Sequence, residues 1–169
     1  MRKVVLIPVM ALAVLLMITP TMAPATKTIV AGEFFGYLID PGTQWISEEG
    51  IVQIRDAVGN GTMTGDLPGM MTFIINAAFD PTTGTAKAWG KYVSTDNYGN
   101  TFEGNFLATI SYWGNHIEGS SEGHGTGAYE GMILKNKYSG YNAYFGLPLP
   151  PYPQGTPIYF YFEGPLISP

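Results

Sequence analysis

The sequence predicts an all-β protein, a closed antiparallel up-and-down β-barrel of about eight strands, preceded by a signal peptide. Runs rich in β-branched and aromatic residues recur at spacings of about 10–15 residues, separated by Gly, Pro, Asn and Asp. After the predicted signal peptide, helical periodicity is almost absent from the chain. Charged residues make up 12% of the chain, about half the usual share, whereas 22 of the 169 residues are glycine and 14% are aromatic. This composition is typical of a β protein with tight turns.

The first 23 residues are predicted to be the signal peptide. Arg2 and Lys3 precede a 15-residue apolar run, residues 4–18, and the small-residue motif Thr21-Met22-Ala23 follows it. A membrane-spanning helix needs about 20 apolar residues, so a cleaved signal is favoured over a permanent anchor. Cleavage after Ala23 is preferred to cleavage after Ala25. The mature protein is therefore expected to be secreted or at the cell surface, and free of the membrane once processed.

Composition limits the partners of the mature part, residues 24–169, which is predicted to be one domain. Its 146 residues are enough for one hydrophobic core, and without any cysteine the core must be held by packing alone. Without residues 1–23, six basic residues face 13 acidic ones, a net charge of −7. This balance argues against nucleic acid and against anionic membrane surfaces, which are bound through clustered Lys and Arg.

The predicted strands follow one another along the whole mature domain. They span residues 28–39, 51–58, 62–67, 70–79, 85–95, 101–113, 116–118 paired with 122–124, 127–138, and 157–163. Residues 80–84 (DPTTG) and 96–100 (DNYGN) have the composition of hairpin turns, and Gly59-Asn60-Gly61 is interpreted as another turn. Short connections between so many strands predict a meander that closes on itself, because closure removes exposed edges.

The predicted strand 101–113 shows the clearest alternation of apolar and polar residues. One face carries Phe102, Phe106, Ala108, Ile110 and Tyr112, and the other carries polar side chains such as Glu103 and Asn105. This pattern is typical of a strand with one side in a core and the other in water. The rings of the Phe and Tyr residues are therefore expected to turn toward the barrel axis.

Two further features concern the bends of the barrel and its last strand. Gly90, Gly104 and Gly131 are expected inside strongly curved strands, where a residue without a side chain is needed. Residues 146–157 contain five prolines in 12 residues. This segment is predicted to be an extended, polyproline-like loop that leads to the final strand.

Two glycine-rich stretches resemble a known family. Residues 125–132 (GTGAYEGM) look like the G-x-G-x-[FY]-x-G motif that begins a strand in allene oxide cyclase-like barrels, a group that includes the dirigent proteins. Residues 61–67 (GTMTGDL) resemble the short early G-x-x-x-G strand of the same barrels, and FEGNF at residues 102–106 lies between the two in the expected order.

The resemblance covers about residues 51–138. It implies an eight-stranded barrel whose mouth can hold an apolar small molecule, and some members cyclise or couple such molecules. Some also form trimers, so a homo-oligomer is a further expectation. No functional residue of the family can be matched to a position in this chain.

Both histidines of the chain lie in one short stretch, His116-Ile-Glu118-Gly-Ser-Ser-Glu122-Gly-His124. If residues 119–121 form a turn, Glu118 faces Glu122 and His116 faces His124 on one side of a hairpin. Two imidazoles and two carboxylates in that arrangement could hold zinc. The competing interpretation, a polar hairpin tip in water without a metal, is favoured because such spacings are common in surface strands.

Function is left open among three interpretations. The first is a barrel that binds a small apolar or amphipathic ligand, with Trp89, Phe102, Phe106, Tyr112 and Tyr129 as the ligand-binding residues, unless these rings simply fill the core. The second is an isomerase or cyclase of the allene oxide cyclase type. The third is a structural cell-surface protein in which residues 25–39 add to a neighbour's sheet.

The interior of the barrel separates these interpretations. A hollow interior with one or two buried polar groups favours ligand binding. A buried carboxylate, or a tyrosine with a strongly shifted pKa, favours an enzyme. A filled interior with a loose N-terminal strand favours a structural role. The sequence contains no phosphate-binding loop, dinucleotide fingerprint or serine nucleophile motif, so no cofactor is expected and no catalytic residue is assigned.

Overall fold

The computed structural model describes residues 24–111, 116–141 and 153–169. The predicted signal peptide and most of the predicted proline-rich loop lie outside these described residues. The described part consists of strands and one short 3₁₀ turn, η1, with no α-helix. Its elements are β1 (Thr26–Asp40), β2 (Thr43–Ile46), β3 (Val52–Gly65), β4 (Gly69–Asp80), β5 (Thr85–Asp96), β6 (Thr101–Ser111), β7 (His116–Gly125), η1 (Gly127–Tyr129), β8 (Ile133–Tyr141) and β9 (Pro157–Ser168).

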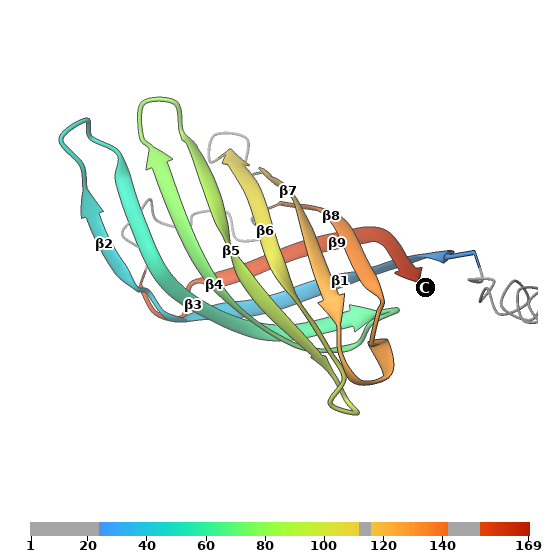
Figure 1. Cartoon of the computed structure of the whole chain (residues 1–169). Helices are drawn as coiled ribbons and strands as arrows, with labels where there is room; N and C mark the ends of the chain where they lie inside the picture. The colour runs from blue at the N-terminus through green and yellow to red at the C-terminus, as the bar shows by residue number, and fades with distance from the viewer. Residues whose placement is uncertain (1–23, 112–115, 142–152) are drawn as a thin grey trace, which may run out of the picture.

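Eight of the strands close into an antiparallel barrel (Figure 1). Strands β3 to β9 form an up-and-down meander, and β1 closes the ring by pairing with β9 on one side and with β3 on the other. The seam between β1 and β9 runs from the pair Thr26 and Ser168 to the pair Tyr37 and Pro157. Strand β2 pairs only with β3 and stands outside the ring. The predicted closed up-and-down barrel of about eight strands is confirmed.

Strand β3 is one long strand, although the sequence predicted two strands joined by a turn at Gly59-Asn60-Gly61. That prediction is wrong, because these three residues lie in register opposite residues 71–73 of β4. The strand bends at a bulge instead. There Asp56 has a φ of 55°, and its amide donates a hydrogen bond to Asn76 Oδ1 at 3.2 Å.

The connection between β7 and β8 also differs from the prediction of a strand that begins at residue 127. Residues 127–129 form η1, and β8 begins only at Ile133. Gly127 and Gly131 have φ values of 64° and 79°, a region in which glycine alone is comfortable. Gly131 therefore lies in a turn and not inside a curved strand. The stretch 125–132, on which the family resemblance partly rests, is the connection between these two strands.

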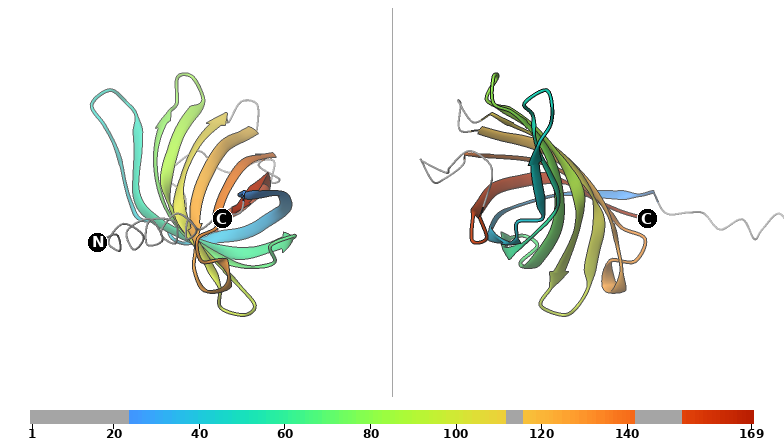
Figure 2. Two further views of the ribbon diagram at one scale, coloured as in Figure 1. Left: turned by 45° about the vertical axis from the view of Figure 1, so that its right-hand side comes forward. Right: turned by 90° about the vertical axis from the view of Figure 1, so that its left-hand side faces the viewer.

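The hydrophobic core is the interior of the barrel, around which the strands curl in Figure 2. Phe34 is completely buried there, stacked on Phe160 with ring centroids 4.9 Å apart and edge-on to Phe73 at 5.8 Å. The predicted alternation in β6 is confirmed over the described residues: Phe102 is buried, whereas its neighbour Glu103 is exposed. Phe106, Ala108 and Ile110, on the same face of β6, also pack against the core.

Candidate functional site: an apolar cavity inside the barrel

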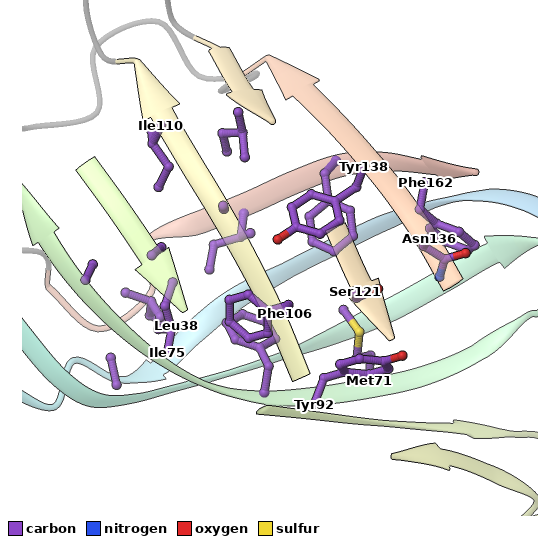
Figure 3. A pocket seen from close by; sticks show the side chains of 18 of the residues that line it. Leu38, Met71, Ile75, Tyr92, Phe106, Ile110, Ser121, Asn136, Tyr138 and Phe162 are labelled. Carbon is purple, nitrogen blue, oxygen red and sulfur yellow. The ribbon is translucent and has the colours of Figure 1, made fainter. Parts of the chain in front are cut away.

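The interior of the barrel is not filled. It holds a cavity of about 170 Å³, lined by residues from all nine strands and from the segment before β9 (Figure 3). Most of the lining is aliphatic or aromatic. One end is formed by residues such as Leu38, Ile75 and Ile110, and the other by Met71, Tyr92 and Phe162 with their neighbours.

The cavity is open because several aromatic rings lie flat against the barrel wall. Each of these rings lies in register opposite a glycine of the neighbouring strand, and the pairs are Phe73 with Gly59, Phe106 with Gly90, Tyr138 with Gly119 and Phe162 with Gly32. A Cβ atom built on Gly90 would lie 2.8 Å from the Phe106 ring, and one on Gly32 would lie 2.7 Å from the Phe162 ring. The rings thus occupy the space that a side chain on the opposite strand would fill, and they leave the axis free.

The side chain of Tyr92 also lies over glycines, in this case one on each of the next two strands. It lies opposite Gly104 of β6, and its hydroxyl reaches Gly123 of β7, where any Cβ atom would collide with it. The prediction that Gly104 serves a strand interior is confirmed, and the close approach of the Glu122 carbonyl also excludes a side chain there. The expectation that all rings turn toward the axis is wrong for the rings that cover a glycine.

Polar side chains interrupt the apolar lining at one end. Ser94 of β5 lies there, opposite Met71, and Tyr92 from β5, Ser121 from β7 and Asn136 from β8 form a further group of three, in which Ser121 and Asn136 are directly paired across their two strands. Figure 3 shows all three side chains in the pocket. Tyr92 is 6% exposed, and neither its hydroxyl nor Asn136 Oδ1, both buried, has a hydrogen-bond partner. Buried polar atoms are rarely left unpaired, so these two atoms are candidates to pair with a polar group inside the cavity.

Burial raises the pKa of Tyr92 to about 12, although the Ser121 hydroxyl, which is near the phenol but outside hydrogen-bond geometry, acts to lower it. The phenol is therefore neutral at any physiological pH. Burial also raises the pKa of Tyr138, on the same wall. The Tyr138 hydroxyl is satisfied, however, because it donates a hydrogen bond to the Leu107 carbonyl at 2.6 Å.

The five residues predicted to bind a ligand lie in different places. Phe106 lines the cavity. Phe102 is buried outside the cavity lining and stacks on Tyr129, with ring centroids 4.7 Å apart. The Tyr129 hydroxyl donates to Asp96 Oδ2 at 3.0 Å, and neither ring of this pair lines the cavity. Tyr112 lies outside the described residues.

Trp89 lies on the outer face of β5, where 37% of its surface is exposed. The Arg55 guanidinium lies over its ring, 5.0 Å from the centroid, and also 5.5 Å from the centroid of Trp45 in β2. Arg55 further donates to the Ala77 carbonyl at 3.1 Å. This contact ties β2 to the barrel wall and faces away from the cavity.

The stretch that holds both histidines is not a hairpin. Residues 116–125 form the single strand β7, so its four candidate metal ligands lie along one outer face and do not converge. His116 Nε2 contacts Glu118 Oε1 at 2.8 Å, whereas Glu122 pairs with Lys135 at 3.0 Å. Gly119, which looked like a turn residue, is the glycine that receives the Tyr138 ring. Across the residues that the structure describes, no group of three or more His, Cys, Asp or Glu could hold a metal ion.

Strand β1 is held on both sides over most of its length. It pairs with β9 along 12 residue pairs, and from Gly32 onward it also pairs with β3. The described chain contains no helix that is long and apolar enough to cross a membrane.

The fold and the cavity together define a closed eight-stranded antiparallel barrel with a hollow apolar interior. Comparisons of the chain with models of protein families, with curated proteins and with solved structures find no match.

Proposed function

We propose that the protein binds a small, uncharged, apolar molecule inside its barrel, outside the cytoplasm as its predicted signal peptide implies. The observation that carries the proposal is the hollow interior with its apolar lining. A volume of about 170 Å³ corresponds to roughly ten or more water-sized groups, so a ligand of about ten non-hydrogen atoms fits. Burying each CH₂ group of such a ligand contributes about 0.8 kcal/mol.

An isomerase or cyclase of the allene oxide cyclase type is the second interpretation, and the resemblance of residues 51–138 is its main support. The described lining of the cavity contains no Asp, Glu, His, Lys or Arg. Tyr92 has a raised pKa, so its phenol stays protonated and is a poor base. Proton transfer, which such chemistry commonly uses, has no evident donor–acceptor pair here, and binding is therefore the better-supported function.

The structural interpretation required a loose N-terminal strand and a filled interior. The pairing of β1 with β9 and β3 supports neither a loose strand nor its release to a neighbouring molecule. The cavity argues against a filled interior. Both observations favour the ligand-binding proposal.

The test is binding of 1-naphthylamine, a fluorophore that is neutral at pH 7 and of about the size that the cavity accommodates, followed by the change in its emission. Two variants place the same side chain on opposite faces of β6. Ala108→Leu adds three carbon atoms to the cavity lining, whereas Thr109→Leu, one residue further, adds a leucine to the outer face. Circular dichroism and thermal unfolding establish that both variants are folded.

We expect saturable binding to the wild type and to Thr109→Leu, and binding weaker by about tenfold or more in Ala108→Leu, a change of about 1.4 kcal/mol or more. No saturable binding to the folded wild type, or equal binding to the two variants, would contradict the proposal. Mass spectrometry of an organic extract of the purified protein then identifies any molecule that it carries from its host.

A further inference from the structure

The polar end of the cavity indicates which class of apolar molecule it takes. The described residues that line the cavity carry no charge. A carboxylate or ammonium group on the ligand would lose its hydration there without meeting an opposite charge, at a large cost in free energy. Fatty acids and amines are therefore poor candidates, and the ligand is expected to be neutral over its whole length.

Two polar atoms in this neutral lining have no hydrogen-bond partner, the hydroxyl oxygen of Tyr92 and Oδ1 of Asn136. Two other polar groups of the lining do have partners. The Tyr138 hydroxyl donates to the Leu107 carbonyl at 2.6 Å, and Thr156 Oγ1 donates to the Pro153 carbonyl at 2.7 Å. The unpaired atoms are thus a local feature of one end, and each costs free energy while it remains unpaired.

The chemistry of the two unpaired atoms restricts the group that can satisfy both. The Tyr92 phenol is neutral and, with its pKa raised further by burial, can donate a hydrogen bond. The Oδ1 atom of Asn136 can only accept one. A ligand carbonyl or ether would satisfy the phenol and leave the amide oxygen unpaired. A hydroxyl group accepts from one partner and donates to the other, so it satisfies both.

We propose that the cavity recognises an uncharged apolar molecule that carries one hydroxyl group, an alcohol or a phenol, which accepts a hydrogen bond from Tyr92 and donates one to Asn136. This inference rests on the proposed function. Ser121 lies between the two partners in the register of the sheet and is placed to join the same hydrogen-bond network. The apolar remainder of the ligand lies along the cavity toward Leu38 and Ile110.

The test compares three ligands of similar size in competition with 1-naphthylamine. They are p-cymene, thymol, which adds one hydroxyl to the same skeleton, and 4-isopropylbenzoic acid, which is charged at pH 7. Two neutral hydrogen bonds predict that thymol binds about 10- to 100-fold more tightly than p-cymene. The acid is expected to bind more weakly than p-cymene.

Two tyrosine variants locate the effect. Tyr92→Phe removes the unpaired hydroxyl and is expected to reduce the preference for thymol to about threefold or less, with p-cymene binding unchanged. Tyr138→Phe makes the same chemical change on the same wall, but its hydroxyl is already bonded to Leu107, so the preference is expected to remain. Asn136→Leu, which keeps a similar volume, serves as an independent second variant and should also reduce the preference.

Equal binding of thymol and p-cymene to the wild type would overturn the inference, although the proposed function would still stand. This result is expected if a trapped water molecule already pairs with the two polar atoms. A preference that survives both Tyr92→Phe and Asn136→Leu, or tight binding of the acid, would also overturn it. If neither the fluorophore nor any of the three ligands binds to the folded wild type, the proposed function itself fails.

Discussion

Replacing Gly59 with alanine tests whether the aromatic rings are held against the wall by the glycines opposite them. Alanine in a strand interior is ordinarily more favourable than glycine by about 0.5–1 kcal/mol. Here the added Cβ would lie 2.7 and 2.9 Å from two carbons of the Phe73 ring and closer still to its Cζ atom. The ring must therefore leave the wall and move into the cavity. Overpacking of this kind costs about 1–3 kcal/mol, so we expect Gly59→Ala to lower the free energy of unfolding by about 1–2 kcal/mol.

The second half of this prediction removes the obstacle. Phe73→Leu deletes the ring and by itself should cost about 1–3 kcal/mol. The three atoms nearest to a Cβ at position 59 all belong to the Phe73 ring, and this variant removes them. Gly59→Ala is then expected to raise the free energy of unfolding by about 0.5–1 kcal/mol, the ordinary advantage of alanine. The change of sign corresponds to a coupling energy of about 1.5–3 kcal/mol between the two positions.

Urea unfolding of the wild type, both single variants and the double variant, followed by tryptophan fluorescence, measures this coupling. Fluorophore binding adds a second readout, because a ring displaced into the cavity should weaken binding in Gly59→Ala. Additive free energies with an unchanged m-value would refute the reasoning. So would a stabilising effect of Gly59→Ala in the presence of Phe73, because the ring would then not occupy the wall position.

Three further changes test other parts of the fold. Phe34→Ala removes the fully buried ring and is expected to lower the free energy of unfolding by about 3–5 kcal/mol in urea; a loss below 1 kcal/mol would contradict its central place. The pKa of Asp96 is lowered to about 2, chiefly by hydrogen bonds from Asn100. The ionised carboxylate therefore stabilises the folded state fully above about pH 4, and this contribution is lost as the pH falls through 2. Asp96→Asn should remove this part of the acid dependence of the free energy of unfolding, and an unchanged pH profile would refute it. Arg55→Lys keeps the charge but loses the planar contact with Trp89 and should cost about 1 kcal/mol, with a change in tryptophan emission; an unaltered emission spectrum would count against the contact.

Alternation along single strands made much of the fold predictable. The inward and outward residues of β6 follow from its apolar pattern, and the turns at residues 80–84 and 96–100 follow from their composition. Glycine was the main source of error. Gly59 and Gly119 are present because a ring from the next strand lies over each of them, and a sequence does not show which residue will be opposite. Such a glycine looks the same as a turn glycine until the register is known.

The candidate site was only partly within reach of the sequence. Trp89 is two residues from Lys87 and two from Lys91, so by the period of two all three share one face of the strand, and the two lysines already place Trp89 on the outer face. The same period places Tyr92 on the inner face with Ala88, a signal that was available and not used. Ser121 and Asn136 gave no such signal, because their meeting depends on the pairing of β7 with β8. A polar cluster assembled from three strands exists only in the folded register.

The seam between β1 and β9 joins Thr26 to Ser168, residues separated by nearly the whole domain. A chain made from its N-terminus cannot complete the ring until residues 157–168, which form β9, have emerged. Before that moment β1 and β8 both present unpaired backbone groups, which other chains can capture. Contacts of such long sequence separation also slow folding. If the chain is exported unfolded, as its predicted signal peptide implies, a newly arrived molecule can associate with other copies of itself until β9 has docked.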